Sequence, residues 1–278
     1  MPPPVAAPDL DAFRDRETMS AASDLRLLPF EIRNAEGERI DAAWRHARGD
    51  RSPASSDPRS APMVVIGHGV TSHWDRPWQT ELSAALSHAG IASVLVSFAG
   101  NGASEGRFED VTPTKEVADL GSVLDALQAW GVTRLMYAGH SMGGAVGAIR
   151  AAADDRIELL VSLAGMFHVH TFMQRTFGHL PYGGLMLDKP GCAWNHALEA
   201  DAARLASLTA QAAAVRVPWL LVHGDADELV PLQDSLDARA AAGGRPDLVV
   251  LPGVDHRFTG AIPAVCDAVV PWLVRHLA

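Results

Sequence analysis

Residues 137–144 read YAGHSMGG and place one serine, Ser141, between an apolar run and a run of small residues. The stretch 134–139 (RLMYAG) has the apolar pattern of a buried strand, and residues 142–153 have that of a helix. A Gly-x-Ser-x-Gly pattern between a strand and a helix is typical of a sharp turn that presents the serine hydroxyl as a nucleophile. The competing interpretation is that Ser141 only caps the helix, the commoner role of a lone serine at such a place.

The same alternation of apolar strands and helices extends over most of the chain. It predicts a mostly parallel sheet that is covered by helices on both faces. The segment 24–47 is expected to form two shorter strands joined by a turn at residues 34–37. The remaining strands are expected at 63–67, 91–98, 134–139, 157–165, 218–224 and 247–253, and the helices at 77–90, 112–131, 142–153, 232–243 and 261–276.

The chain of 278 residues is long enough for one large α/β domain, which we expect to span residues 24–278. Residues 1–23 are rich in Pro, Ala and Asp, and we expect this extension to be disordered. Residues 166–215 interrupt the alternation and carry several aromatic residues. Because long segments between strands are commonly functional, this one is predicted to be a lid; the alternative is a set of packed helices with no gating role.

The composition argues against several classes of partner. A formal net charge of −10 disfavours nucleic acid, because phosphate binding needs a basic face. No apolar run approaches the roughly 18 residues of a membrane helix, so no membrane span is predicted. The two cysteines, Cys192 and Cys266, and the absence of a basic-then-apolar leader favour reduced thiols and a cytoplasmic location. The number of subunits is not defined by the sequence.

A serine hydroxyl becomes a nucleophile only when a base removes its proton. His256, in the stretch GVDHRF after the last expected strand, is predicted to be that base. The acid that orients it is expected in the stretch HGDADELVP, where we select Asp227 over Asp225 and Glu228; Asp255 is a further alternative. Taken singly, a late histidine is commonly a surface residue and such an aspartate a turn residue. The chain order Ser, Asp, His is the one typical of this strand-turn-helix context.

Acyl transfer also needs hydrogen-bond donors at the point where negative charge develops on the substrate oxygen. The backbone N–H of Met142, directly after the serine, is one predicted donor. The other is the N–H of Val70, in the loop after the first parallel strand, where Gly69 lets the backbone turn closely.

Four segments together resemble the α/β-hydrolase superfamily: HGV (68–70), GHSMGG (139–144), HGDADELVP (223–231) and GVDHRF (253–258). The Gly-x-Gly-x-Ser-x-Gly-x-Phe-Glu-x-x-Thr run within residues 97–127 resembles bacterial feruloyl (cinnamoyl) esterases and related acyl-ester hydrolases. The resemblance implies an eight-stranded sheet with a lid after the sixth strand. It also implies a triad of Ser141, Asp227 and His256, with an oxyanion hole from Val70 and Met142.

Three positions depart from that pattern. Ser97 stands where the family usually has an acidic residue, Asn101 where it has a histidine, and Met142 replaces a glutamine common among feruloyl esterases. The first two positions are expected to shape a loop and leave the triad intact. The stretch His168-Val169-His170 lacks acidic or thiolate ligands at a recognisable spacing, so no metal site is predicted.

The predicted function is a serine esterase that cleaves carboxylic esters of small molecules without a cofactor. The same three residue types also serve peptidases, thioesterases and lipases, which remain alternatives. A different class of alternative is a ligand-binding homologue that does not catalyse.

Overall fold

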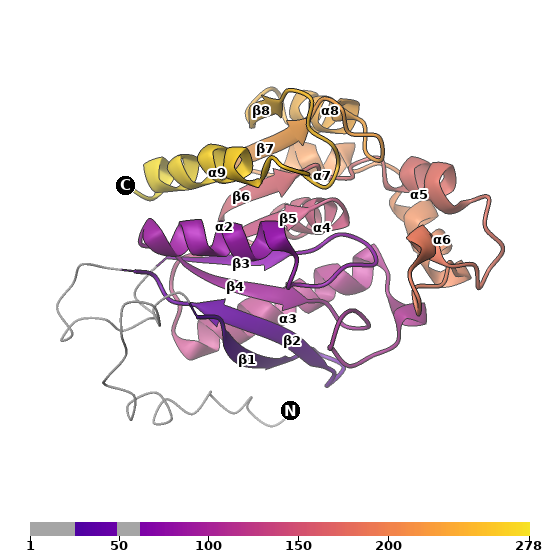
Figure 1. The fold of residues 1–278 in the computed structure, drawn as a ribbon, viewed down its shortest axis with the longest axis horizontal. Helices are drawn as coiled ribbons and strands as arrows, with labels where there is room; N and C mark the ends of the chain where they lie inside the picture. The colour runs from indigo at the N-terminus through magenta and orange to yellow at the C-terminus, as the bar shows by residue number, and fades with distance from the viewer. Residues whose placement is uncertain (1–25, 49–61) are drawn as a thin grey trace.

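The computed structural model describes residues 26–48 and 62–278, so the disorder expected for residues 1–23 concerns a segment outside the described residues. Eight strands form one sheet in the order β1-β2-β4-β3-β5-β6-β7-β8 (Figure 1). β2 pairs antiparallel with β1 and β4, and the pairings from β4 through β8 are parallel, which confirms the predicted sheet. The strands are β1 (Leu28–Arg33), β2 (Arg39–Arg45), β3 (Met63–Gly67), β4 (Ala92–Ser97), β5 (Leu135–His140), β6 (Ile157–Leu163), β7 (Trp219–Gly224) and β8 (Asp247–Leu251).

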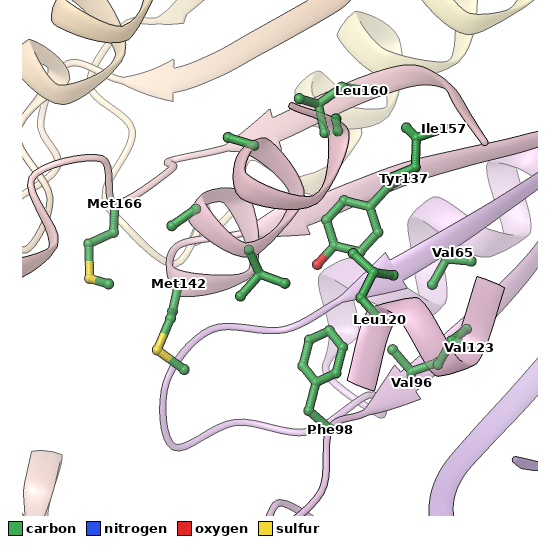
Figure 2. Close-up of a cluster of buried hydrophobic side chains, with 14 of the residues drawn as sticks. Val65, Val96, Phe98, Leu120, Val123, Tyr137, Met142, Ile157, Leu160 and Met166 are labelled. Carbon is green, nitrogen blue, oxygen red and sulfur yellow. The ribbon is translucent and has the colours of Figure 1, made fainter. Parts of the chain in front are cut away.

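Helices cover both faces of the sheet. Along β3, Val64 and Ile66 pack into the cluster that includes residues of α2 and α9, whereas Met63 and Val65 face the cluster with α3 and α4 (Figure 2). This alternation makes β3 apolar at every position, as the sequence shows. None of the described helices is long and apolar enough to cross a membrane. The helices are α2 (Pro77–His88), α3 (Pro113–Trp130), α4 (Met142–Ala151), α5 (Val169–Phe177), α6 (His196–Leu205), α7 (Thr209–Ala214), α8 (Leu232–Ala241) and α9 (Ile262–Leu277), with 3-10 turns η2 (Phe108–Asp110) and η3 (Met186–Asp188).

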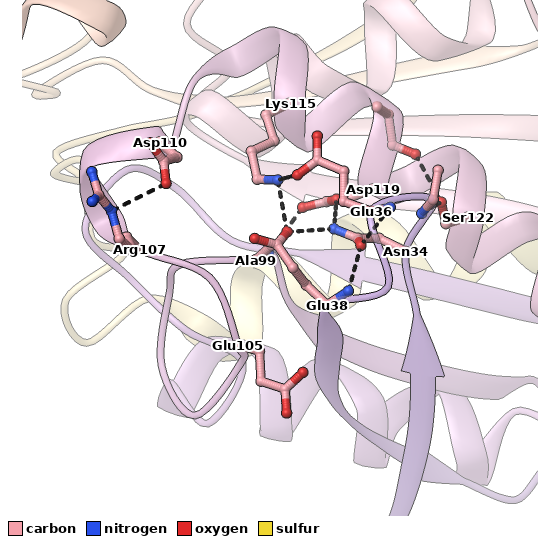
Figure 3. Close-up of polar contacts among 12 residues, drawn as sticks. Asn34, Glu36, Glu38, Ala99, Glu105, Arg107, Asp110, Lys115, Asp119 and Ser122 are labelled. Carbon is pink, nitrogen blue, oxygen red and sulfur yellow. Dashed lines mark hydrogen bonds and ion pairs between the residues drawn. The ribbon is translucent and has the colours of Figure 1, made fainter.

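Polar contacts join α3 to the β1–β2 hairpin and to the loop after β4 (Figure 3). Asn34 donates from Nδ2 to Asp119 Oδ1 at 2.8 Å, and Ala99 N–H donates to the other oxygen of Asp119 at 2.9 Å. Lys115 lies 2.7 Å from the carboxylate of Glu38. These contacts fix the antiparallel edge against the parallel part of the sheet.

Two of the three positions that depart from the feruloyl esterase pattern, Ser97 and Asn101, contact groups in or beside nearby loops. Ser97 Oγ accepts a hydrogen bond from Trp74 N–H at 3.1 Å. Asn101 Nδ2 lies 3.4 Å from the carbonyl oxygen of Ala99 and 3.4 Å from Glu116 Oε1. Both side chains therefore shape loops, the role expected for them.

Residues 164–218, here called the β6–β7 segment, carry α5, α6 and α7. Figure 1 shows α5 and α6 beyond the carboxyl ends of the parallel strands. Phe177 packs between Phe172 and Trp194, with ring centroids 5.9 Å apart in each pair. Asp234 of α8 accepts hydrogen bonds from the backbone N–H groups of Phe167 and His168, at 2.8 and 2.9 Å. Most buried apolar side chains of the segment thus belong to the same core cluster as those of α3 and α4, and the segment is anchored to α8.

Candidate active site

Ser141 occupies the sharp turn between β5 and α4. Its backbone has φ 55° and ψ −116°, a conformation that a non-glycine residue keeps only where its surroundings impose it. The surroundings are backbone: a Cβ on Gly139 would lie 2.2 Å from the carbonyl oxygen of Gly143, and a Cβ on Gly143 would lie 2.5 Å from that of His68. The side chain of Ser141 makes no capping hydrogen bond with α4, so the helix-cap interpretation is wrong.

Hydrogen bonds to neighbouring strands and to the segment after β6 also hold the turn at Ser141 in place. Ser141 N–H donates to the carbonyl oxygen of Leu163 at 2.9 Å, and Ser141 C=O accepts from Met166 N–H at 3.1 Å. The hydroxyl of the fully buried Tyr137 donates to Gly143 C=O at 3.0 Å (Figure 2). Ser141 is therefore fixed by β5, by the end of β6 and by the start of the β6–β7 segment.

The loop after β3 brings Val70 next to this turn. A Cβ on Gly69 would lie 2.9 Å from the Cβ of Ser141, so the loop backbone contacts the serine directly. Within residues 26–48 and 62–278, neither Val70 N–H nor Met142 N–H donates a hydrogen bond. Two unengaged backbone donors next to one hydroxyl can stabilise negative charge on a bound carbonyl oxygen.

His68 fixes the orientation of that loop from inside the protein. Phe98 N–H donates to His68 Nε2 at 3.0 Å, so the ring proton resides on Nδ1, which donates to the carbonyl oxygen of Gly69 at 2.8 Å. Burial lowers the pKa of His68 to about 4, so the ring is neutral at pH 7. Because C=O and N–H point in opposite directions across a trans peptide, holding the Gly69 carbonyl also orients the Val70 N–H.

The structure brings Asp227 and His256 together. His256 Nδ1 donates to Asp227 Oδ2 at 2.7 Å, and the other carboxylate oxygen accepts from the N–H groups of Leu229 and Val230 at 2.9 and 2.8 Å. The Asp227 side chain has no exposed surface. Burial alone would raise the pKa of Asp227, but hydrogen bonds from His223 and His256 outweigh it and hold this pKa well below its usual range. Asp227 is therefore a carboxylate that faces an imidazole.

The alternative acids have other partners. Asp225 accepts from Gly253 N–H at 2.6 Å, and Asp255 accepts from Thr259 N–H at 2.8 Å, both as turn residues. Glu228 is exposed. Of the acids considered from the sequence, Asp227 alone contacts His256.

His140, the residue before the serine, connects the two halves of the site and was not predicted from the sequence. Its Nε2 donates to the carbonyl oxygen of His256 at 2.8 Å, and the two rings lie 4.7 Å apart. Burial, and next the neighbouring His256, lower the pKa of His140 to about 3, so it is a neutral donor. No hydrogen bond joins Ser141 to His256; such contacts commonly tighten only when substrate binds. The position of His140 inside the GHSMG motif was the signal that could have suggested its role.

Lys189 of the β6–β7 segment contacts the Val70 loop. Its Nζ donates to the carbonyl oxygen of Thr71 at 2.9 Å, across 118 residues of chain. Burial, followed by the charges of Arg76 and Arg257, lowers the pKa of Lys189. The β6–β7 segment therefore reaches the residue next to one of the unengaged backbone donors.

Comparison with known proteins gives a family match and distant relatives. Residues 58–189 match the family described as serine aminopeptidase, S33. Uncharacterized proteins from two strains of Mycobacterium tuberculosis are each 29% identical over 209 residues, which cover 71% of this chain and 63% of the relative. The match to this chain thus spans less than two thirds of the length of these relatives.

Solved structures share the fold over most of the chain. Est1E from Butyrivibrio proteoclasticus with bound ferulic acid superposes with a TM-score of 0.74 at 24% identity, covering 89% of this chain and 99% of Est1E. An esterase domain from Rhodothermus marinus gives 0.68 at 21% identity, covering 90% and 98%. A serine hydrolase without a lid from Xanthomonas campestris gives 0.60 at 22% identity, covering 91% and 95%. The chain is therefore an α/β-hydrolase-fold protein, and the resemblance to feruloyl esterases expected from its sequence is confirmed at the level of the fold.

Proposed function

We propose that this protein is a serine hydrolase that cleaves carboxylic esters of small molecules. Ser141 is the nucleophile, His256 the base and Asp227 the orienting acid, with the N–H groups of Val70 and Met142 as oxyanion donors. The observation that carries the proposal is the 2.8 Å hydrogen bond from His140 to the carbonyl oxygen of His256. It supports the proposal because it ties His256, whose ring is paired with a buried carboxylate, to the residue directly before Ser141.

The proposed reaction follows from the tautomer of His256. Because Asp227 only accepts, the proton resides on Nδ1 and the lone pair on Nε2 is free to take the proton of Ser141 Oγ. The serine oxygen then attacks the ester carbonyl, and the negative oxygen that forms is stabilised by the Val70 and Met142 N–H groups. Nε2–H protonates the departing alcohol, leaving an acyl-serine. Water deprotonated by the same nitrogen releases the acid and restores the serine.

The charges near the site favour an ester over a peptide with a free amino terminus. An aminopeptidase must accommodate the ammonium group of its substrate, which needs a nearby negative charge. Lys189 instead lies close enough to Arg76 and Arg257 for their charges to lower its pKa, after the larger effect of burial. These cations would repel an ammonium group. In this proposal the β6–β7 segment, which contacts the Val70 loop through Lys189, is the lid over the substrate.

Initial rates on a panel of substrates test the proposal. The panel contains p-nitrophenyl acetate, butyrate and palmitate, methyl ferulate and an aminoacyl p-nitroanilide. We expect turnover of short esters or of methyl ferulate by the wild-type protein, and a loss of about 10⁶-fold in kcat for Ser141→Ala, by analogy with serine-protease triads. Ser122→Ala, a substitution on α3 away from the site, is the matched control and should keep full activity.

Labelling with a serine-directed phosphonate identifies the nucleophile independently of the substrate chosen. We expect mass spectrometry to locate the label on Ser141 in the wild-type protein and in Ser122→Ala, and to find none in Ser141→Ala. Cleavage of the anilide alone would establish a peptidase instead. The absence of both turnover and labelling would contradict catalysis and favour the ligand-binding alternative.

A further inference from the structure

His223, the penultimate residue of β7, is fully buried and has no role in the reaction described above. Its Nε2 lies 2.9 Å from the carbonyl oxygen of Val230 and 3.3 Å from Asp227 Oδ2. Both of these oxygens can only accept, so Nε2 carries a proton. Its Nδ1 lies 2.7 Å from the hydroxyl of Ser235 in α8, which can donate to it. The ring is therefore bound on both sides in the Nε2–H tautomer.

The carboxylate of Asp227 has four hydrogen-bond donors around it. Two backbone N–H groups, of Leu229 and Val230, bind Oδ1, and two histidines, His223 and His256, approach Oδ2. Val230 is bound from both ends, because its N–H donates to Asp227 while its C=O accepts from His223. This closed ring of hydrogen bonds fixes the turn that carries Asp227 onto the end of β7.

We propose that His223 is a positioning residue for the triad: its Nε2–H, 2.9 Å from the carbonyl oxygen of Val230 and 3.3 Å from Asp227 Oδ2, limits the negative charge that this carboxylate oxygen presents to His256. The inference rests on the proposed function. A hydrogen bond to a carboxylate withdraws charge from it, so His223 opposes the protonation of His256 by weakening the carboxylate that stabilises the protonated ring. Without His223, His256 would retain a proton at higher pH and could not act as a base there.

Two other titratable groups lie close enough to interact with His223 or His256, namely Asp234 and His140. Asp234 of α8 is buried, and burial raises its pKa, but its carboxylate is bound to the N–H groups of Phe167 and His168. His140 of β5 faces His256 as a neutral donor to its backbone. Besides His256, His223 is the one side chain within the described residues whose nitrogen lies within 3.5 Å of the Asp227 carboxylate, at 3.3 Å.

The test compares His223→Leu, which removes the donor, with His223→Gln, whose amide can still donate to Asp227. For His223→Leu we expect kcat/KM to fall by up to about tenfold on the acid side of its pH profile and by less at alkaline pH, with KM nearly unchanged. The acid side of its kcat/KM profile should move to higher pH by roughly one unit. His223→Gln and the control Ser122→Ala should keep the wild-type position of that limb. A folded His223→Leu that is fully active, or that loses activity equally at every pH, would overturn the proposal.

Two further measurements cover the cases in which His223→Leu does not fold or the wild-type protein is inactive. If His223→Leu fails to fold, Ser235→Ala removes the hydroxyl that fixes the tautomer and should give a smaller shift in the same direction; an unchanged profile overturns the proposal. If the wild-type protein neither turns over esters nor takes up the phosphonate, the proposed function fails on its own. The pH at which the His256 ring titrates, followed by NMR, then decides the role of His223: a displaced midpoint in the folded variant supports it and an unchanged midpoint refutes it.

Discussion

Substitution of Gly143 by alanine tests whether the turn and the Val70 loop are fixed by the same backbone contact. The added Cβ would lie 2.5 Å from the carbonyl oxygen of His68 and 3.1 Å from that of Gly67, both backbone atoms. Ordinary contact begins near 3.4 Å, so the loop must retreat by about 0.9 Å. Overpacking of this kind costs about 1–3 kcal/mol, offset by roughly 1 kcal/mol because alanine is the better helix former.

The larger expected effect of Gly143→Ala is on activity. The loop that must move carries the Val70 N–H, and a misplacement of about 1 Å in a catalytic group can cost roughly 10²-fold in rate. We therefore expect kcat/KM for a p-nitrophenyl ester to fall about 10²-fold while the melting temperature changes by only a few degrees.

Gly121→Ala is the matched control for this substitution. It is also a Gly→Ala change within a helix, and its added Cβ would lie 2.4 Å from a guanidinium nitrogen of Arg150, a side chain that can move. It should leave kcat/KM unchanged. A folded Gly143→Ala protein with wild-type kcat/KM would refute the inference that this contact positions the proposed oxyanion donor, Val70 N–H.

Two other outcomes follow from the buried histidines His68 and His140 and from the half-buried Lys189. The pKa values of His68 and His140 are lowered from 6.5 to about 4 and about 3. Between these values and 6.5 the unfolded chain binds protons that the folded chain does not. The stability that the two neutral, buried rings contribute is therefore complete above pH 6.5 and is lost as the pH falls below it. Urea unfolding should show a loss of roughly 2 kcal/mol for each histidine between pH 8 and pH 5, and equal stability at both would contradict their neutral burial. Lys189→Met removes the contact with Thr71 and should raise KM for esters about tenfold or less, with little change in stability. Steady-state kinetics and thermal melts measure the two effects. An unchanged KM would show that the contact does not position the loop.

The fold was predictable because the parallel strands β3 to β7 are apolar at most positions and buried on both faces. The expected strand at 63–67 coincides with β3 (Met63–Gly67), since both faces of that strand are buried. The expected helix at 112–131 contains α3, because Thr112 caps it by accepting from Lys115 N–H and Gly131 ends it with φ 102°. Apolar strands and helix caps depend on residues that are close together in the sequence, so they can be predicted from it.

The supporting histidines could not be predicted in the same way. The role of His140 depends on a backbone carbonyl 116 residues away, and that of His68 on an N–H group 30 residues away. The contact between Lys189 and Thr71 likewise joins the β6–β7 segment to the loop after β3, and the two residues are 118 positions apart in the sequence. Each of these partners is a backbone group, and nearly every residue type has the same backbone N–H and carbonyl groups. The residue type of the partner therefore does not indicate the contact, which is visible only in the folded structure.

The distribution of hydrogen bonds over the four histidines near Ser141 explains why one of them differs chemically from the rest. His68 and His223 are hydrogen-bonded at both ring nitrogens, and His140 is bound to the backbone of His256 with its pKa lowered to about 3. In His256 only Nδ1 is engaged, by Asp227, and Nε2 keeps a free lone pair. A histidine whose nitrogens are both occupied can fix geometry but cannot move a proton without breaking a buried bond. In the proposed mechanism His68 and His223 therefore serve as scaffold, His140 has a pKa too low for it to act as a base at neutral pH, and proton transfer is left to His256.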